Sequence, residues 1–165
     1  MPGVSRMGHS RIMHCLAVVV LMSISCSRPP AISSIDRREV VQDALSRALI
    51  AKQVPDYNLL RDPTHVVVST HLLDAADIPS LPGVVLEPLT DEAIRHRANE
   101  TGDFLHLRFS RLEVLDSEHV VVHLATAWAR CDTSRVPYLS GGGMMLKYFK
   151  RAGEWVGEVV GTWIS

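Results

Sequence analysis

The sequence is poor in cysteine, with only three in 165 residues: Cys15, Cys26 and Cys131. The first two lie within and at the end of an N-terminal segment that reads as a leader, so the rest of the chain holds Cys131 alone. One thiol cannot form an intrachain disulfide, and structural zinc sites need several Cys or His ligands at set spacings. The sequence therefore predicts neither a disulfide scaffold nor a structural zinc site.

The sequence also lacks a cluster of positive charge. Of its 17 basic residues, Arg6 and Arg11 lie in the first 25, which leaves 15 against 18 acidic residues in the remainder. Proteins that bind nucleic acids need a clustered basic face to displace the counterions of the polyanion. The charge balance therefore argues against a nucleic acid as partner, and the length allows one globular domain.

No hydrophobic run is long enough for a membrane-spanning helix. The apolar stretch "CLAVVVLMSI" covers ten residues, 15–24, whereas a bilayer span needs about 20. It follows a polar, basic and acid-free start, which is the pattern of a signal peptide. We expect residues 1–25 to be a signal peptide, 26–34 a Pro- and Ser-containing tether, and 35–165 one domain.

Cys26 ends the motif "SISC", which resembles a bacterial lipobox, the signal for lipid attachment to the cysteine. Such boxes usually have leucine where this sequence has Ser23, and Ser23 and Ser25 also suit ordinary signal peptidase. Lipid attachment at Cys26 predicts a protein exported to the periplasmic face of a bacterial membrane. The alternatives are cleavage to a periplasmic or secreted protein and an organelle transit peptide.

Two helices are predicted in the domain. The first starts near Ser34, with Asp36 as N-cap and Glu39 at the capping-box spacing. The second follows Thr90 as N-cap and ends at Gly102, a typical C-terminal residue of a helix. The apolar stripe of the first helix comprises Val40, Val41, Ala44, Leu45, Ala48 and Leu49.

Alternating apolar residues predict strands in the rest of the domain. Short strands are expected at 64–70 and, at an edge, 84–86; long ones at 103–115 and 119–130. A turn at Ser117–Glu118 places Leu115 opposite Val120 and Phe104 opposite Cys131. The core face then comprises Leu105, Leu107, Phe109 and Leu115 with Val120, Val122, Leu124 and Trp128.

A second hairpin is predicted at the C-terminus, with Ala152-Gly153 as its turn and Lys147 opposite Glu158. On its last strand Gly157 and Gly161 alternate with Trp155, Val159 and Trp163, all on one face of the strand. Missing side chains at the two glycines leave either a ligand groove or room for a helix to pack closely. Both interpretations remain open from the sequence.

The predicted elements follow the order helix, second helix and two long hairpins, and the last turn reads "AGEWVGEVV". This order resembles the cystatin-like architecture, and within it the nuclear transport factor two-like superfamily. The chain also resembles bacterial exported proteins with a "GDFLHLRF"-like strand and a "YLSGGG" segment. The first resemblance implies a curved antiparallel sheet wrapped around helices as a cone. The fold class expected is therefore α+β, a strongly bent antiparallel sheet with one long and one short helix packed on it.

His106 and Cys131 are the candidate site residues of the domain. The expected register makes them diagonal neighbours at about 7–8 Å between Cα atoms, and a thiolate with an imidazole base is a nucleophilic pair. An incidental contact at a strand end is the alternative. His119 and His123 lie on a strand, roughly 13 Å apart, which is too far to share a metal ion.

Two functions of different class follow. One is non-enzymatic binding of a partner or ligand at the cell envelope, by a domain held at a membrane through lipid on Cys26. The other is a small pocket enzyme, a hydrolase or isomerase using His106 with a nearby acid or Cys131. The sequence offers no convincing acid–base pair and indicates no cofactor or metal, so it favours the first.

Overall fold

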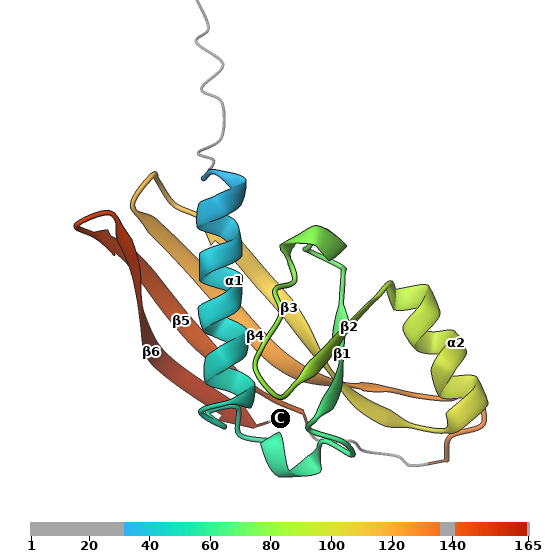
Figure 1. Cartoon of the computed structure of the whole chain (residues 1–165). Coiled ribbons are helices and arrows are strands. Elements are labelled where there is room, and N and C mark those ends of the chain that lie inside the picture. Colours follow the sequence, from blue (N-terminus) through green and yellow to red (C-terminus); the bar gives the residue numbers. More distant parts are fainter. Residues whose placement is uncertain (1–31, 136–140, 165) are drawn as a thin grey trace, which may run out of the picture.

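The computed structural model describes residues 32–135 and 141–164, and these form a six-stranded sheet with two α-helices (Figure 1). The sheet order is β2-β1-β3-β4-β5-β6. The elements in chain order are α1 Ser34–Leu49, the 3₁₀ turn Tyr57–Leu59, β1 His65–Ser69, the 3₁₀ turn Ala75–Asp77, β2 Val85–Leu89, α2 Asp91–Thr101, β3 Phe104–Val114, β4 His119–Ala129, β5 Gly142–Arg151 and β6 Glu154–Ile164.

The expected α+β class is confirmed, but the sheet is mixed and open. Strands β3 to β6 pair antiparallel, whereas β1 pairs parallel with both β2 and β3. Helix α2 lies between β2 and β3 in the chain, and such a crossover returns the chain to run in the same direction. The prediction of a wholly antiparallel sheet is therefore wrong for β1 and β2. Strand β2 forms the edge of the sheet at this end, and β6 forms the opposite edge.

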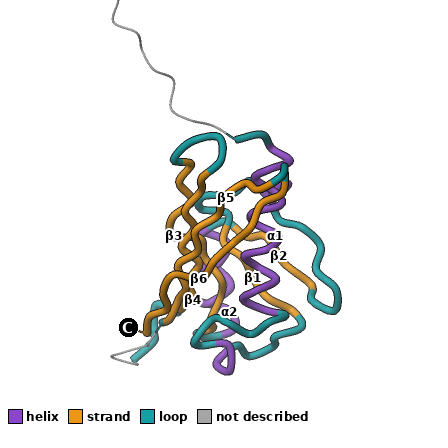
Figure 2. The backbone as a smooth tube through the Cα atoms, turned by 90° about the vertical axis from the view of Figure 1, so that its left-hand side faces the viewer, coloured by secondary structure: helices purple, strands orange, loops and turns teal. Residues whose placement is uncertain are grey.

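Helix α1 packs along one face of the sheet as a second layer (Figures 1 and 2). Its predicted stripe is buried throughout. The N-cap is Ser33, whose Oγ accepts from the Asp36 amide, so the assignment of Asp36 as N-cap is wrong. Asp36 instead accepts from Lys150 Nζ at 2.6 Å and from Trp155 Nε1 at 2.8 Å, which joins the start of the helix to the β5–β6 hairpin.

Helix α2 packs on the other face of the sheet. It is capped by Thr90 and ends at Gly102, whose φ is 84°, as the sequence predicts. Its Ile94 and Ala98 form a cluster with Val67, whereas the flanking residues Val66 and Val68 of β1 belong to the α1 cluster. Because successive side chains of a strand point to opposite faces, the two helices lie on opposite sides of β1.

The β3–β4 hairpin has a wider loop than expected. Residues 115–118 form the loop, so Val114 lies opposite Val120, and Phe104 lies opposite Ala129. A bulge at Ser110 exchanges the two faces of β3 beyond that point, which leaves Leu115 half exposed at 51%. Of the predicted core face, Leu105, Leu107, Phe109, Val120, Val122 and Leu124 are buried, and Trp128 is partly buried.

The β5–β6 hairpin has the predicted turn, and Lys147 pairs with Glu158. A second bulge, at Val160, exchanges the faces of β6 as well. Trp155 therefore packs against the α1 cluster, whereas Trp163 stacks edge-on against His123 at 6.1 Å on the other face. The prediction that both tryptophans share one face is wrong.

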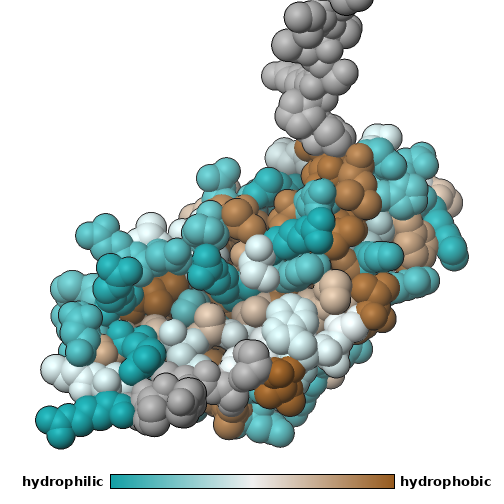
Figure 3. All heavy atoms as spheres, turned by 180° about the vertical axis from the view of Figure 1, so that it is seen from behind, coloured by the Kyte–Doolittle hydropathy of each residue, from teal (hydrophilic) through white to brown (hydrophobic). Residues whose placement is uncertain are grey.

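The N-terminal predictions lie outside the described residues. The signal peptide, Cys26 and most of the tether 26–34 fall within residues 1–31. Neither helix in the described part of the chain is long and apolar enough to cross a bilayer. Seen from behind, hydrophobic and hydrophilic side chains are interspersed over the surface (Figure 3).

Candidate functional site

His106 lies on the α2 face of β3 and lines a cavity of about 350 Å³. Strand β3 directs His106 and Arg108 to this face, since they are two residues apart, and α2 lies beside them. We refer to this space as the His106 cavity. Its lining residues are Asp91, Ile94, Arg95, His106, Arg108, Ala127, Trp128, Ala129 and Arg130.

Burial makes His106 a weak base. Its side chain is almost wholly buried, with 6% of the residue exposed, and desolvation lowers its pKa from 6.5 to about 4. The positive charge of Arg108 also lowers this pKa, whereas the carboxylate of Asp91 opposes the shift. His106 is therefore neutral at pH 7, and its Nδ1 is buried with no hydrogen-bond partner.

Cys131 does not lie where the sequence places it. Ala129, not Cys131, is opposite Phe104, so Cys131 falls two residues beyond the end of β4 and is absent from the lining of the His106 cavity. Its backbone amide donates to Asp103 Oδ1 at 2.8 Å, and its Sγ lies 3.6 Å from Thr133 Oγ1. The register on which the predicted diagonal pair with His106 rests is wrong.

Asp91 is the residue of this cavity lining that could act as an acid or base beside His106, but it already has other partners. Asp91 accepts from Ser69 Oγ at 2.7 Å and pairs with His71 Nδ1 at 3.2 Å. The bond from Ser69 is the main reason that the pKa of Asp91 lies below its usual value. Asp91 is therefore ionised at pH 7 and held at the side of β1.

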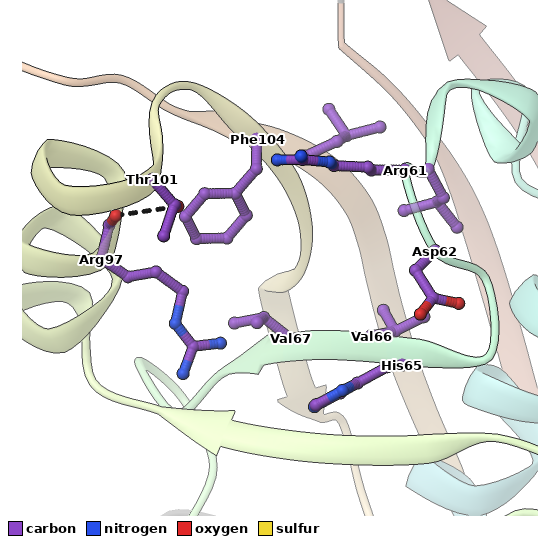
Figure 4. A pocket seen from close by; sticks show the side chains of 10 residues that line it. Arg61, Asp62, His65, Val66, Val67, Arg97, Thr101 and Phe104 are labelled. Carbon is purple, nitrogen blue, oxygen red and sulfur yellow. Dashed lines mark hydrogen bonds between the residues drawn. The ribbon is translucent and has the colours of Figure 1, made fainter.

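A second cavity, of about 440 Å³, lies between the C-terminal half of α2 and the start of β1 (Figure 4). We call it the α2–β1 cavity. Apolar side chains of Val67, Phe104 and their neighbours form its walls, and polar side chains from three segments surround them (Figure 4). The full lining is Leu60, Arg61, Asp62, His65, Val66, Val67, Arg97, Thr101, Phe104 and Leu105.

An ion-pair network fixes one side of the α2–β1 cavity. Both terminal nitrogens of Arg97 donate to the two oxygens of Glu87, a bidentate pair that joins α2 to β2. His65 Nε2 lies 3.1 Å from Glu87 Oε2. The bond from Arg97 lowers the pKa of Glu87, and the carboxylate raises the pKa of Arg97. Both groups are therefore charged at pH 7, and the Arg97 side chain has a set position beside the cavity.

Sequence reasoning missed this network. Glu87 sits in a strand of five residues within a Pro-rich stretch, and its partner Arg97 is ten residues away on a helix. The sequence does contain His65 and Glu87 on two short strands that follow one another in the chain. Their contact can be predicted only if β1 and β2 are known to pair in parallel.

No group of three or more His, Cys, Asp or Glu side chains within residues 32–135 and 141–164 is placed to hold a metal ion. His119 pairs with Asp116 at the end of its hairpin, 2.9 Å from Nδ1 to Oδ1, and His123 stacks on Trp163. The two histidines thus have separate partners.

Gly157 serves helix packing rather than a ligand groove. A Cβ at this position would lie 2.5 Å from Tyr148 Cε1, and the Gly157 carbonyl accepts from Arg47 of α1 at 2.9 Å. Tyr148 Oη in turn donates to Asp43 of α1 at 3.0 Å. Of the two interpretations of the glycines on β6, close packing holds at Gly157.

Comparisons with known proteins give no relative. No protein-family model matches the chain. No curated protein and no solved structure matches it either.

Proposed function

We propose that the chain is a non-enzymatic binding domain that takes a small amphiphilic ligand in the α2–β1 cavity. The observation that carries the proposal is the cavity itself, a space of about 440 Å³ whose lining combines apolar side chains with polar and charged ones. Small-molecule sites are typically concave, of roughly 300–1,000 Å³, mostly apolar, with a few polar groups that orient the ligand.

The walls of the cavity indicate the chemistry of the ligand. Val67 is 7% exposed and belongs to the apolar cluster beneath α2, and Phe104 packs against the same cluster. Arg61, Asp62 and His65 stand around the opening and are exposed. An apolar ligand body would contact Val67 and Phe104, and a polar end would remain beside the charged groups.

The surroundings of His106 support binding over catalysis. The pocket-enzyme alternative requires an acid or Cys131 within hydrogen-bond reach of His106. His106 Nδ1 has no partner, Asp91 is held by Ser69 and His71, and Cys131 lies beyond the end of β4. A histidine with a pKa of about 4 is also a poor general base near pH 7.

We propose in addition that the domain works at the cell envelope, exported and held at a membrane by lipid on Cys26, with simple secretion as the other route. The sequence of the leader is what supports this. The finer resemblance to the cystatin-like cone is also a proposal, supported by the long helix α1 lying over the antiparallel strands β3–β6.

Native mass spectrometry of the protein purified from its own host tests the ligand proposal. We expect the wild type to carry an additional non-protein mass. Thr101→Trp fills the cavity from the exposed end of α2 and should abolish that mass. The matched control is His96→Trp, because His96 is exposed on the same helix and lines neither cavity.

Two results would contradict the proposal. One is a wild-type protein with no bound mass. The other is a bound mass that Thr101→Trp and His96→Trp retain equally, which would place the ligand elsewhere on the molecule.

A further inference from the structure

The charged side chains around the α2–β1 cavity differ in whether they already have partners. Arg97 donates to both oxygens of Glu87, and His65 Nε2 lies 3.1 Å from the same carboxylate. The negative charge of Glu87 therefore balances the positive charge of Arg97. This network fixes the position of one wall, but it does not select the sign of a ligand's charge.

Asp62 is also engaged, within the loop that leads into β1. Its Oδ1 accepts from the Thr64 amide at 2.9 Å and from Thr64 Oγ1 at 2.6 Å, the pattern by which aspartate forms a turn with its own backbone. The two bonds from Thr64 hold the pKa of Asp62 below its usual value, so the group is ionised at pH 7. Asp62 lies beside Val66, on the opposite side of the cavity from Phe104 (Figure 4).

Arg61 is the lining cation whose charge is not matched. It has no hydrogen bond, ion pair or ring contact with any residue of 32–135 or 141–164. Its side chain is exposed and extends toward Phe104, away from the carboxylate of Asp62 (Figure 4). An arginine on an open surface needs no partner but water, whereas Arg61 lines a cavity together with Val67 and Phe104. Its five N–H donors are therefore available to a ligand that lies on these apolar walls.

We propose that the ligand of the α2–β1 cavity is an amphiphilic carboxylate whose head group accepts hydrogen bonds from Arg61 and whose apolar body lies on Val67 and Phe104. This inference rests on the function proposed above and adds the chemistry of the ligand's polar end. The planar guanidinium matches the two oxygens of a carboxylate. One unmatched positive charge fits a monoanion, and the head group on the Phe104 side stays away from Asp62.

NMR titration of the isotope-labelled protein at pH 7 with octanoate, octanol and octylamine tests the head group, because the three probes share one chain length. We expect saturable shifts of the Val67 and Phe104 amide signals. Octanoate should bind about fivefold more tightly than octanol, the effect of one exposed ion pair, and octylamine should bind most weakly. Added salt should weaken the binding of octanoate and leave that of octanol unchanged.

Variants assign the preference to Arg61. Arg61→Gln should weaken octanoate binding about fivefold and leave octanol binding unchanged, so that the two probes bind alike. The matched control is Arg95→Gln, because Arg95 is an exposed arginine of α2 that does not line this cavity. It should keep the preference for octanoate.

The outcomes separate this inference from the function on which it rests. If neither octanoate nor octanol shifts the Val67 and Phe104 signals, both the binding function and the carboxylate are overturned. If octanol binds as tightly as octanoate, or octylamine binds more tightly, the cavity binds ligands but the carboxylate head group is wrong. The same holds if salt affects octanoate and octanol alike, or if Arg61→Gln keeps the preference.

Discussion

Two glycines on β6, Gly157 and Gly161, look alike in sequence but differ in what surrounds them. A Cβ on Gly157 would meet Tyr148 Cε1 at 2.5 Å and Asp43 Oδ2 at 2.9 Å, whereas one on Gly161 would meet Met145 Cε at 3.5 Å. The first contact requires the buried Tyr148 ring to move, because real Cβ atoms do not approach so closely. The second is an ordinary van der Waals contact.

Gly157→Ala should therefore lower the free energy of unfolding by about 1–3 kcal/mol, the usual cost of overpacking. Gly161→Ala is the control and should stay within about 0.5 kcal/mol of the wild type. Urea denaturation of both variants measures the difference. Equal stabilities would mean that Tyr148 does not pack on Gly157.

The buried His106 makes the stability of the domain depend on pH. Its folded pKa of about 4 lies below the unfolded value of 6.5, so the unfolded chain binds more protons between these values. The contribution of neutral His106 is fully present above pH 6.5 and is lost as the pH falls toward 4. Asp91 and Arg108 are the charged groups that act on His106, and Asp91 remains ionised because its own pKa is lowered.

We expect His106→Gln to remove part of the pH dependence. Between pH 7 and pH 5 the wild type should lose roughly 2 kcal/mol through this group, from 1.36 kcal/mol per pKa unit. Urea denaturation at both pH values, in wild type and variant, gives the two slopes. Parallel slopes would show that His106 titrates normally and is not buried as described.

At the scale of elements, the turn of the β5–β6 hairpin contains a residue ill suited to its conformation. Ala152 has a φ of 49° and Gly153 a φ of 90°. A side chain in the left-handed region costs about 1 kcal/mol, although asparagine tolerates it, and Asn-Gly is the preferred pair for such two-residue turns. Ala152→Asn should therefore raise the free energy of unfolding by about 1 kcal/mol.

Gly153→Ala is the opposite test of the same turn. No atom lies within 4 Å of a Cβ placed there, so any loss comes from backbone strain alone. Urea denaturation should show a loss of about 1 kcal/mol or more. A stabilised Gly153→Ala, or a destabilised Ala152→Asn, would contradict the positive φ angles.

The helices, strands and turns were easier to predict than the registers in which the strands pair. The caps Thr90 and Gly102, the stripe of α1 and the turn at Ala152-Gly153 are local patterns, and the structure confirms them. The bulges at Ser110 and Val160 leave no comparable local pattern, because any residue can be the extra one in a strand. Each bulge exchanges the faces beyond it, which explains the exposed Leu115 and the separation of Trp155 from Trp163.

At the scale of the whole molecule, the prediction fails where contacts join segments distant in the sequence. β1 and β2 are short, and nothing in their residues indicates that they pair in parallel or that β3 joins β1 on the other side. The face taken by α2 follows from this pairing, since Val67 of β1 supplies part of its contact surface. His106 could be identified as a candidate from its strand position, but the arginines around it come from α2, β3 and the end of β4.

The proposed attachment of the whole protein to a membrane rests on Cys26, which lies outside the described residues. If Cys26 is lipidated, residues 1–25 are removed and the chain begins at an acylated cysteine. Two or more acyl chains give durable anchoring, because each buried methylene adds about 0.8 kcal/mol. Helix α1 begins at Ser34, the last residue of the expected tether.

Cys26→Ser should accordingly move the protein from the membrane to the soluble fraction of its host while the domain stays folded. Cell fractionation with intact-mass measurement is the assay, since the mass reports both the cleavage site and the acyl chains. Cys15→Ser is the matched control, a cysteine of the same leader that should leave the distribution unchanged. If Cys26→Ser is cleaved and distributed like the wild type, simple secretion replaces lipidation. Because serine rather than aspartate follows Cys26, at Ser27, the lipidated protein is expected in the outer membrane of a host that has one.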